Sequence, residues 1–267
     1  DLRQALHRAP EVSGEEAETA RRVAAFLGET GPDRLVTELG GHGVAAVYDS
    51  GEPGPTLMVR AELDALPIEQ KSDRPWRSTR PGTSHLCGHD GHIATLAGVA
   101  LALGRQRPGR GRAVLLFQPA EEDGSGAAAV LADPAFDAIA PDIAIALHNM
   151  PGIARGRAAL IEGPANCASR SLQVTLSGTT AHASSPDQGR SPMTALCELM
   201  PGLTALGRGG DLDADFSLVT ITHASMGERE AGIAPGSAEL WATLRTLSDA
   251  RMGDLVGRAE ALVRDAA

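Results

Sequence analysis

The chain of 267 residues is 42% apolar and 3% aromatic, and its 24 Lys and Arg against 34 Asp and Glu give a formal charge of −10. Such a chain lacks the basic surface and the stacking aromatic residues of nucleic-acid binders, so no nucleic-acid partner is expected. No segment approaches the roughly 18 consecutive apolar residues of a membrane-spanning helix, and no membrane partner is expected either.

The predicted elements begin with a helix and two strands. Ser13 and Glu16 form a capping-box pattern, and apolar residues then recur at helical spacing, which predicts a helix over residues 14–28. The runs 44–48 and 56–63 have the composition of strands and are separated by a turn rich in Gly and Pro. We expect these two strands to pair as a hairpin.

A buried helix and two further strands follow. Residues 91–106 form a run of small and aliphatic residues that is too long for a strand. Short apolar runs at 114–117 and 143–147 predict strands that are covered on both faces of a parallel or mixed sheet. This alternation predicts an α/β architecture whose site lies at the carboxyl ends of the strands.

The second half has a different order of elements. We predict strands and helices in the order strand 170–177, helix 191–206, strand 216–222, strand 238–246 and helix 249–265. A ferredoxin-like β-α-β-β-α-β unit has this order plus one more strand, so we expect that the chain is cut short. Two domains are expected, residues 1–165 and residues 166–267.

The most informative segment is HLCGHDGH, residues 85–92, which precedes the predicted buried helix. It holds three histidines, a cysteine and an aspartate, which are ligands of metals such as zinc. Its glycines allow a tight turn, so that side chains two residues apart can converge on one ion. The alternative is a polar loop whose histidines cap the helix, but the density of ligand types favours a metal site.

Two glutamates, Glu121 and Glu122, follow the predicted strand 114–117. Adjacent side chains at a strand end point to opposite sides. One carboxylate can therefore bind a metal while its neighbour acts as a general base on a metal-bound water. The alternative is an acidic start to the following helix, which the helix dipole would favour.

Two other strand ends carry similar groups. His148 follows the strand 143–147, and Asp64 and Glu62 share one side of the end of an earlier strand. A carboxylate in this position could orient a ligand imidazole. The alternative for each is an exposed strand-end residue without a function. However, open α/β enzymes assemble their sites by gathering several ligand types at one sheet edge.

The sequence resembles the aminoacylase and carboxypeptidase type of di-metal amidohydrolases, in the branch of hippurate, N-acyl-amino-acid and indole-acetyl-amino-acid hydrolases. The matching runs are LHRAPEVSGEE, RAELDALP, HLCGHDGH, FQPAEEDG, ALHNMPG and GTTAHASSPDQGRSP. This resemblance covers most of the chain. It implies a zinc-exopeptidase-like catalytic domain, a mixed sheet covered by helices, with an inserted ferredoxin-like α+β lid and dimerisation domain.

The resemblance also implies roles for individual residues. The implied ligands of two divalent ions, zinc, manganese or cobalt, are Cys87, His89, Glu122 and His148. Glu121 would be the general base, and Asp64 the carboxylate that orients a ligand. His182 would stabilise the tetrahedral oxyanion, and Arg245 would lie near the substrate carboxylate. The alternatives are a strand-closing polar residue for His182 and a surface arginine for Arg245.

The sequence departs from the resemblance in its length and at single positions. Family members run further and return to the catalytic domain with another histidine ligand, so we expect this chain to lack that part. Glu62 stands where this branch usually has Asp, and Gly232–Pro235 stands where many members have Asn-Val-Ile-Pro. Two hypotheses follow, an active enzyme or a truncated, inactive homologue that binds metal or dimerises.

The leading hypothesis is a metal-dependent amidohydrolase that cleaves N-acyl or N-aroyl amino acids into a carboxylic acid and a free amino acid. Its partner would be a second copy of the chain, joined as a homodimer through the lid domain. The odd number of cysteines, Cys87, Cys167 and Cys197, favours a reducing compartment. With no apolar signal core in the first 30 residues, we expect a cytoplasmic protein.

Overall fold

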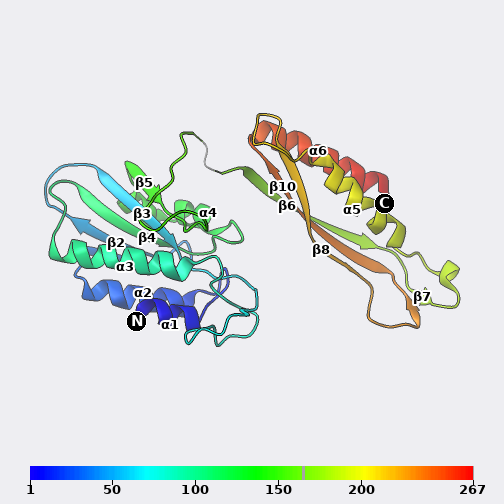
Figure 1. Cartoon of the computed structure of the whole chain (residues 1–267), viewed down its shortest axis with the longest axis horizontal. Coiled ribbons are helices and arrows are strands. Elements are labelled where there is room, and N and C mark those ends of the chain that lie inside the picture. The colour runs from blue at the N-terminus through cyan, green and yellow to red at the C-terminus, as the bar shows by residue number, and fades with distance from the viewer. Residues whose placement is uncertain (164–165, 267) are drawn as a thin grey trace. The chain divides into compact units, whose positions relative to one another are not determined.

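The computed structural model describes residues 1–163 and 166–266. The chain divides into two compact units, Asp1–Arg155 (unit 1) and Gly156–Ala267 (unit 2) (Figure 1). The predicted domain boundary lies between residues 165 and 166, and residue 165 is outside the described part of the chain. No helix among the described residues has both the length and the apolar character that crossing a bilayer requires.

Unit 1 is a five-stranded mixed sheet with helices on both faces (Figure 1). Its strands are β1 (Arg34–Leu39), β2 (Gly43–Asp49), β3 (Thr56–Glu62), β4 (Arg112–Gln118) and β5 (Ile143–Ala146). Its helices are α1 (Leu2–Arg8), α2 (Ala17–Glu29), α3 (His89–Arg105) and α4 (Gly126–Ala132), with a 3₁₀ turn, η1 (Pro134–Ile139). The strand order is β1-β2-β4-β3-β5, and β3 is parallel to both of its neighbours.

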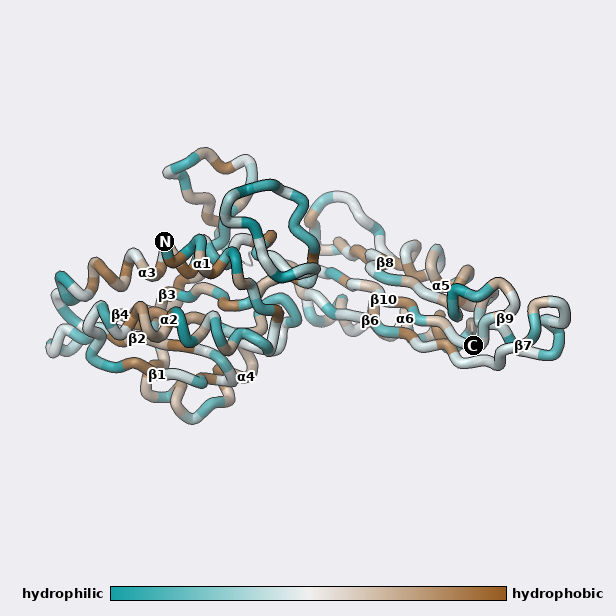
Figure 2. The backbone as a smooth tube through the Cα atoms, turned by 90° about the horizontal axis from the view of Figure 1, so that it is seen from below, coloured by the Kyte–Doolittle hydropathy of each residue, from teal (hydrophilic) through white to brown (hydrophobic). Residues whose placement is uncertain are grey.

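Each face of this sheet buries its own apolar cluster. On one face the strands pack against α1, α2 and α3, through residues such as Leu6, Leu27 and Ile93. On the other face they pack against α4 and η1, through Val130 and Ile139. Figure 2 shows hydrophobic and hydrophilic segments alternating along the helices that cover this sheet. The two layers hold the strand ends in fixed positions, which is what a site at this edge requires.

Two predictions about strand environment are wrong. The strands β2 and β3 do not form a hairpin, because β4 lies between them and pairs with both. The strand β5 is not covered on both faces either. It is the edge strand of the sheet, and all four of its residues are exposed. The apolar run therefore predicts the strand correctly but does not show whether other elements cover it.

The predicted capping box at the start of α2 is also wrong. The helix begins at Ala17, and its N-cap residue Glu16 makes no capping hydrogen bond through its side chain. Instead, the Ser13 hydroxyl donates to Asp64 Oδ2 over 2.8 Å, and Glu16 Oε1 accepts the Ala120 N–H over 2.7 Å. Both side chains are thus bound to strand-end segments that are distant in sequence.

Unit 2 contains a three-stranded antiparallel sheet with two helices packed on it. Its elements are β6 (Ala168–Ser177), β7 (Ala181–His182), η2 (Pro186–Gln188), α5 (Met193–Leu206), β8 (Ser217–Met226), β9 (Ile233–Ala234), β10 (Ser237–Thr246) and α6 (Asp249–Ala266). The main sheet has the order β6-β10-β8, and β7 pairs with β9 apart from it. Burial alternates along β10, so one face of the sheet packs on the helices through residues such as Leu199, Leu240 and Leu255.

The mixed sheet of unit 1 and the β-α-β-β-α order of unit 2 confirm the predicted fold class. In unit 1 the parallel strands β3, β4 and β5 all end at the same edge. The segments that follow them, together with the start of α3, carry the predicted metal ligands. The fold thus brings together residues that are far apart in the sequence.

Candidate metal centre

The segment before α3 presents two of the predicted ligands, Cys87 and His89. Gly88 lies between them as the N-cap of α3, with a left-handed backbone (φ 98°). This conformation is costly for residues with a Cβ atom, which explains the glycine here. The turn leaves His89 buried and Cys87 partly exposed at the sheet edge.

His89 is the centre of the cluster. Its Nδ1–H donates to the backbone oxygen of Asp64 over 2.8 Å. Its Nε2 lies 3.7 Å from Glu121 Oε2 and 3.7 Å from Glu122 Oε1. Asp64 itself accepts hydrogen bonds from Ser13 and from the backbone N–H of Glu122. Asp64 therefore joins the turn after β4 to the histidine it supports.

Cys87 and His148 also lie close to His89. Cys87 Sγ lies 3.2 Å from His148 Nε2. The Nδ1–H of His148 donates to the backbone oxygen of Asn149 over 2.8 Å, which leaves Nε2 with a lone pair directed at the sulfur. The segment after β5 and the turn before α3 thus contact each other through two atoms that can bind a metal, His148 Nε2 and Cys87 Sγ.

Burial or neighbouring charges raise the pKa of three groups in the cluster. Burial raises the pKa of Glu121, and the charge of Glu122 raises it further. Burial and Glu122 also raise the pKa of the Cys87 thiol to about 12. Burial alone would lower the pKa of His89, but the hydrogen bond and charge of Asp64 and the charge of Glu62 raise it overall.

Several atoms at this edge fit a bound cation. His89 Nε2, Glu122 Oε1 and Asp64 Oδ1 are buried and have no hydrogen-bond partner within residues 1–163 and 166–266. Leaving such an atom unpaired costs about 1–3 kcal/mol. Three groups of residues lie close enough to share an ion: Cys87 with His89 and His148, His89 with Glu121 and Glu122, and the buried Glu62 with His89 and His92. Thiol, imidazole and carboxylate donors suit zinc, manganese or cobalt.

Six of the eight predicted site residues lie at this edge of unit 1, namely Asp64, Cys87, His89, Glu121, Glu122 and His148. The other two, His182 and Arg245, lie in unit 2. His182 is exposed on β7, and its Nδ1 accepts the Ser184 N–H over 3.2 Å. Arg245 is exposed on β10. Unit 1 by itself assembles the residues expected to bind metal and move a proton.

Two residues at the edge had no predicted role. His92, one turn into α3, contacts Glu62 through Nδ1 over 2.7 Å. Asn149 donates its backbone N–H to His92 Nε2 over 3.1 Å. The only sequence signal for them was their position, His92 within the histidine-rich segment and Asn149 next to His148. The first histidine of that segment, His85, is buried apart from these contacts, and burial lowers its pKa to about 4.

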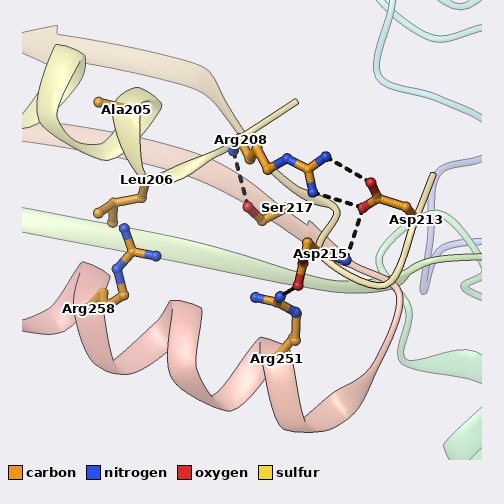
Figure 3. Close-up of a pocket in the computed structure, with 8 residues that line it drawn as sticks. All are labelled: Ala205, Leu206, Arg208, Asp213, Asp215, Ser217, Arg251 and Arg258. Carbon is orange, nitrogen blue, oxygen red and sulfur yellow. Dashed lines mark hydrogen bonds and ion pairs between the residues drawn. The ribbon is translucent and has the colours of Figure 1, made fainter. Parts of the chain in front are cut away.

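A recess on unit 2 is also lined by charged residues, which Figure 3 shows. Arg208 pairs there with Asp213 over 2.8 Å, and Arg251 pairs with Asp215. Two of its three arginines already bind an aspartate, and no His or Cys is among the residues that line it, so the recess lacks the metal-ligand set of the strand-end cluster. The edge of unit 1 is therefore the better candidate site.

Comparison with known proteins finds similar sequences over most of the chain. The sequence profile of the peptidase family M20/M25/M40 matches residues 58–261. The chain is 36% identical over 250 residues to N-acetyl-L-cysteine deacetylase of Bacillus subtilis strain 168, covering 92% of this chain and 58% of that protein. It is 31% identical over 248 residues to hippurate hydrolase of Campylobacter jejuni, covering 93% of this chain and 64% of that protein.

A solved structure is similar as well. The Bacillus subtilis YXEP protein, described as a dinuclear metal-binding peptidase from the M20 family, superimposes with a TM-score of 0.70 at 28% identity. The match covers 99% of this chain and 69% of that one. The chain thus spans about six tenths of the length of the two curated relatives.

Proposed function

Because the chain belongs to the peptidase family M20/M25/M40, we propose that it is a metal-dependent amidohydrolase that releases amino acids from small N-acyl or N-aroyl conjugates. Its similarity to a deacetylase and to hippurate hydrolase supports this substrate class. The observation that carries the proposal is the convergence of Cys87, His89, His148 and two glutamates on one sheet edge, with buried atoms left unpaired.

Four residues hold the ions in this proposal: Cys87, His89, Glu122 and His148. When bound, two divalent ions polarise the amide carbonyl and acidify water, and zinc, manganese and cobalt all suit the donors. Asp64 fixes the orientation of His89, since its backbone oxygen accepts the Nδ1–H and leaves Nε2 free. His148 is oriented in the same way by the backbone oxygen of Asn149.

Glu121 moves the proton. Its carboxylate lies next to the cluster but makes no hydrogen bond to another side chain among the described residues, so Oε2 is free to accept a proton from the attacking water. Burial and the Glu122 charge raise its pKa, which makes it a stronger base than an exposed glutamate. The same carboxyl group then donates this proton to the leaving amine.

His182 and Arg245 bind the substrate in this proposal. Because the Ser184 N–H donates to Nδ1 of His182, the ring proton lies on Nε2, where it can be donated to a developing oxyanion. Arg245 provides a guanidinium for the carboxylate of the amino-acid product. Both are exposed and therefore available to a ligand.

We further propose a homodimer formed through unit 2 and a cytoplasmic location. The strands β6 and β8 are edges of the unit 2 sheet, and their outer backbone groups suit sheet extension by a second copy. Cys87, Cys167 and Cys197 are all free thiols, which fits a reducing compartment.

The test is hydrolysis of N-acetyl-L-cysteine and hippurate by the chain loaded with zinc, manganese or cobalt, with the metal content measured in parallel. Glu121→Gln should lower the rate by about 10²–10⁴-fold and leave the metal content unchanged, because it removes only the base. Asp123→Asn is the matched control on the same turn, since the Asp123 side chain hydrogen-bonds only Ser125 among the described residues. It should leave the rate unchanged.

Two results would contradict the proposal. A chain that binds metal but hydrolyses no N-acyl amino acid would support the metal-binding, inactive homologue instead. A Glu121→Gln variant with the full rate would show that another group is the base.

A further inference from the structure

Asn149 joins the two halves of the metal centre. Its backbone N–H lies 3.1 Å from His92 Nε2, and its side-chain oxygen Oδ1, an acceptor, lies 2.6 Å from the same nitrogen. Its backbone oxygen accepts the Nδ1–H of His148 over 2.8 Å. One residue thus binds a histidine of α3 on one side and a proposed ligand on the other.

His92 is a firm anchor for these contacts. It lies in the first turn of α3, and its side chain is 3% exposed. Since the Glu62 carboxylate only accepts, Nδ1 of His92 carries a proton and donates it to Glu62 over 2.7 Å. Glu62 is itself buried and is paired with Arg60. The orientation of the His92 ring is therefore fixed from the strand β3.

Asn149 also packs against the turn that carries the other ligands. A Cβ atom built on Gly88 would lie 2.5 Å from Asn149 Oδ1, closer than real Cβ contacts. The Asn149 side chain therefore occupies the space that any other residue at position 88 would need. Gly88 separates Cys87 from His89, so the Asn149 side chain lies directly over the turn between two proposed ligands.

The segment after β5 has little else to hold it. The strand β5 is a short, exposed edge strand, and His148 and Asn149 are exposed themselves. Apart from the contact with Cys87, the bonds to His92 are the only side-chain hydrogen bonds that tie His148 or Asn149 to a distant segment in the described part of the chain. Without them, His148 would lose its fixed distance from Cys87.

We propose that Asn149, anchored by His92 and Glu62, is a positioning residue that sets the distance between Cys87 Sγ and His148 Nε2 for metal binding. This inference rests on the proposed function only in taking these two atoms as ligands. Groups that orient metal-binding imidazoles typically change metal affinity by about 10–100-fold when they are removed.

The test measures Co²⁺ binding to the metal-free chain and the absorbance of the thiolate–Co²⁺ charge-transfer band. Asn149→Ala loses the side chain but keeps the backbone bonds, so its affinity should fall about 10-fold. His92→Gln removes the imidazole that anchors Asn149, and its affinity should fall towards 100-fold. In both variants the charge-transfer band should weaken or shift, because sulfur and imidazole no longer share one geometry.

The controls are matched substitutions elsewhere in the described chain. Asn166→Ala and His223→Gln change the same residue types at exposed positions in unit 2. Both should bind Co²⁺ like the parent chain. Thermal melting followed by circular dichroism identifies any variant that has simply lost its fold, and Asn149→Ala, at an exposed site, should melt like the parent.

Three results would overturn the inference, and they can be told apart. If the parent chain binds Co²⁺ and both site variants bind it equally well with the same band, Asn149 does not position the ligands, while the proposed function stands. If Asn149→Ala raises KM for substrate but leaves Co²⁺ affinity and the band unchanged, Asn149 contacts substrate instead. If the parent chain binds no Co²⁺, both the proposed function and this inference fail.

Discussion

An alanine at position 126 should displace the turn that carries Glu121. Gly126 is the first residue of α4, and a Cβ atom built on it would lie 1.7 Å from the carbonyl oxygen of Pro119. An ordinary contact begins at 3.4 Å, so the two atoms must separate by a further 1.7 Å. The turn is not free to yield, because the Ala120 N–H is bound to buried Glu16 and the Ala120 oxygen to the Gly126 N–H.

The size of the effect follows from this geometry. Inserting a methyl group into a packed site typically costs about 1–3 kcal/mol, and here the obstacle is backbone rather than a flexible side chain. We therefore expect Gly126→Ala to lower the free energy of unfolding by about 2 kcal/mol. A misplacement of about 1 Å can reduce catalysis about 100-fold, so the hydrolysis rate should fall by at least about 100-fold.

A second Gly→Ala change provides the control. Gly98 lies on the exposed side of α3, and a Cβ atom there would meet no atom within 4 Å. Gly98→Ala should raise the free energy of unfolding by about 0.5–1 kcal/mol, because alanine favours the helix. Urea unfolding followed by circular dichroism and the hydrolysis of N-acetyl-L-cysteine measure both effects. A Gly126→Ala variant with parental stability and rate would refute the argument.

Two further predictions concern metal removal and pH. Removing bound metal should lower the free energy of unfolding of unit 1 alone, by about 2.7 kcal/mol if the ion was present at 100 times its Kd. The fluorescence of Trp76 reports unit 1 and that of Trp241 reports unit 2. An equal loss of stability in both units would contradict this prediction. Burial raises the pKa of Tyr48, the only tyrosine of the chain. The unfolded residue titrates near pH 10, so below about pH 10 the contribution of Tyr48 to stability is complete. This contribution is lost as the pH rises through the higher pKa of the folded state. Tyrosinate absorbance should therefore appear only above pH 10 and together with unfolding, and a titration near pH 10 in folded protein would show that the phenol is accessible.

Most helices and strands could be predicted from the sequence because each has a local cause. The strand β10 alternates buried and exposed residues along its length, which is the period that sequence reasoning detects. The pairing of strands has no such local signal. The turn between β2 and β3 has the composition of a hairpin, but β4 inserts between them because the helical connection through α3 returns the chain to that position. The strand β1 gave no prediction, since its burial does not alternate regularly.

The candidate site divides in the same way. Cys87, His89, Glu121, Glu122 and His148 could be predicted because their chemistry is unusual and each stands at the end of a recognisable element. The sequence pattern assigns Ser13 and Glu16 to a local cap, which is the commonest use of that pattern. Their actual partners, Asp64 and Ala120, are far away in sequence, and a long-range bond to a buried group outweighs a local cap worth about 1 kcal/mol.

The residues that hold the ligands in place are harder to recognise than the ligands themselves. A thiol or a glutamate pair can be assigned to a metal centre by type, whereas Asn149 has a role only because its backbone and side chain meet His92, His148 and Gly88 at once. Those three contacts depend on the pairing of β5 with β3, which orders the strand end. The chemistry of the site can therefore be predicted from residue types, but the exact positions of its atoms depend on the sheet. Substitutions at Asn149 and Gly126 would test this dependence.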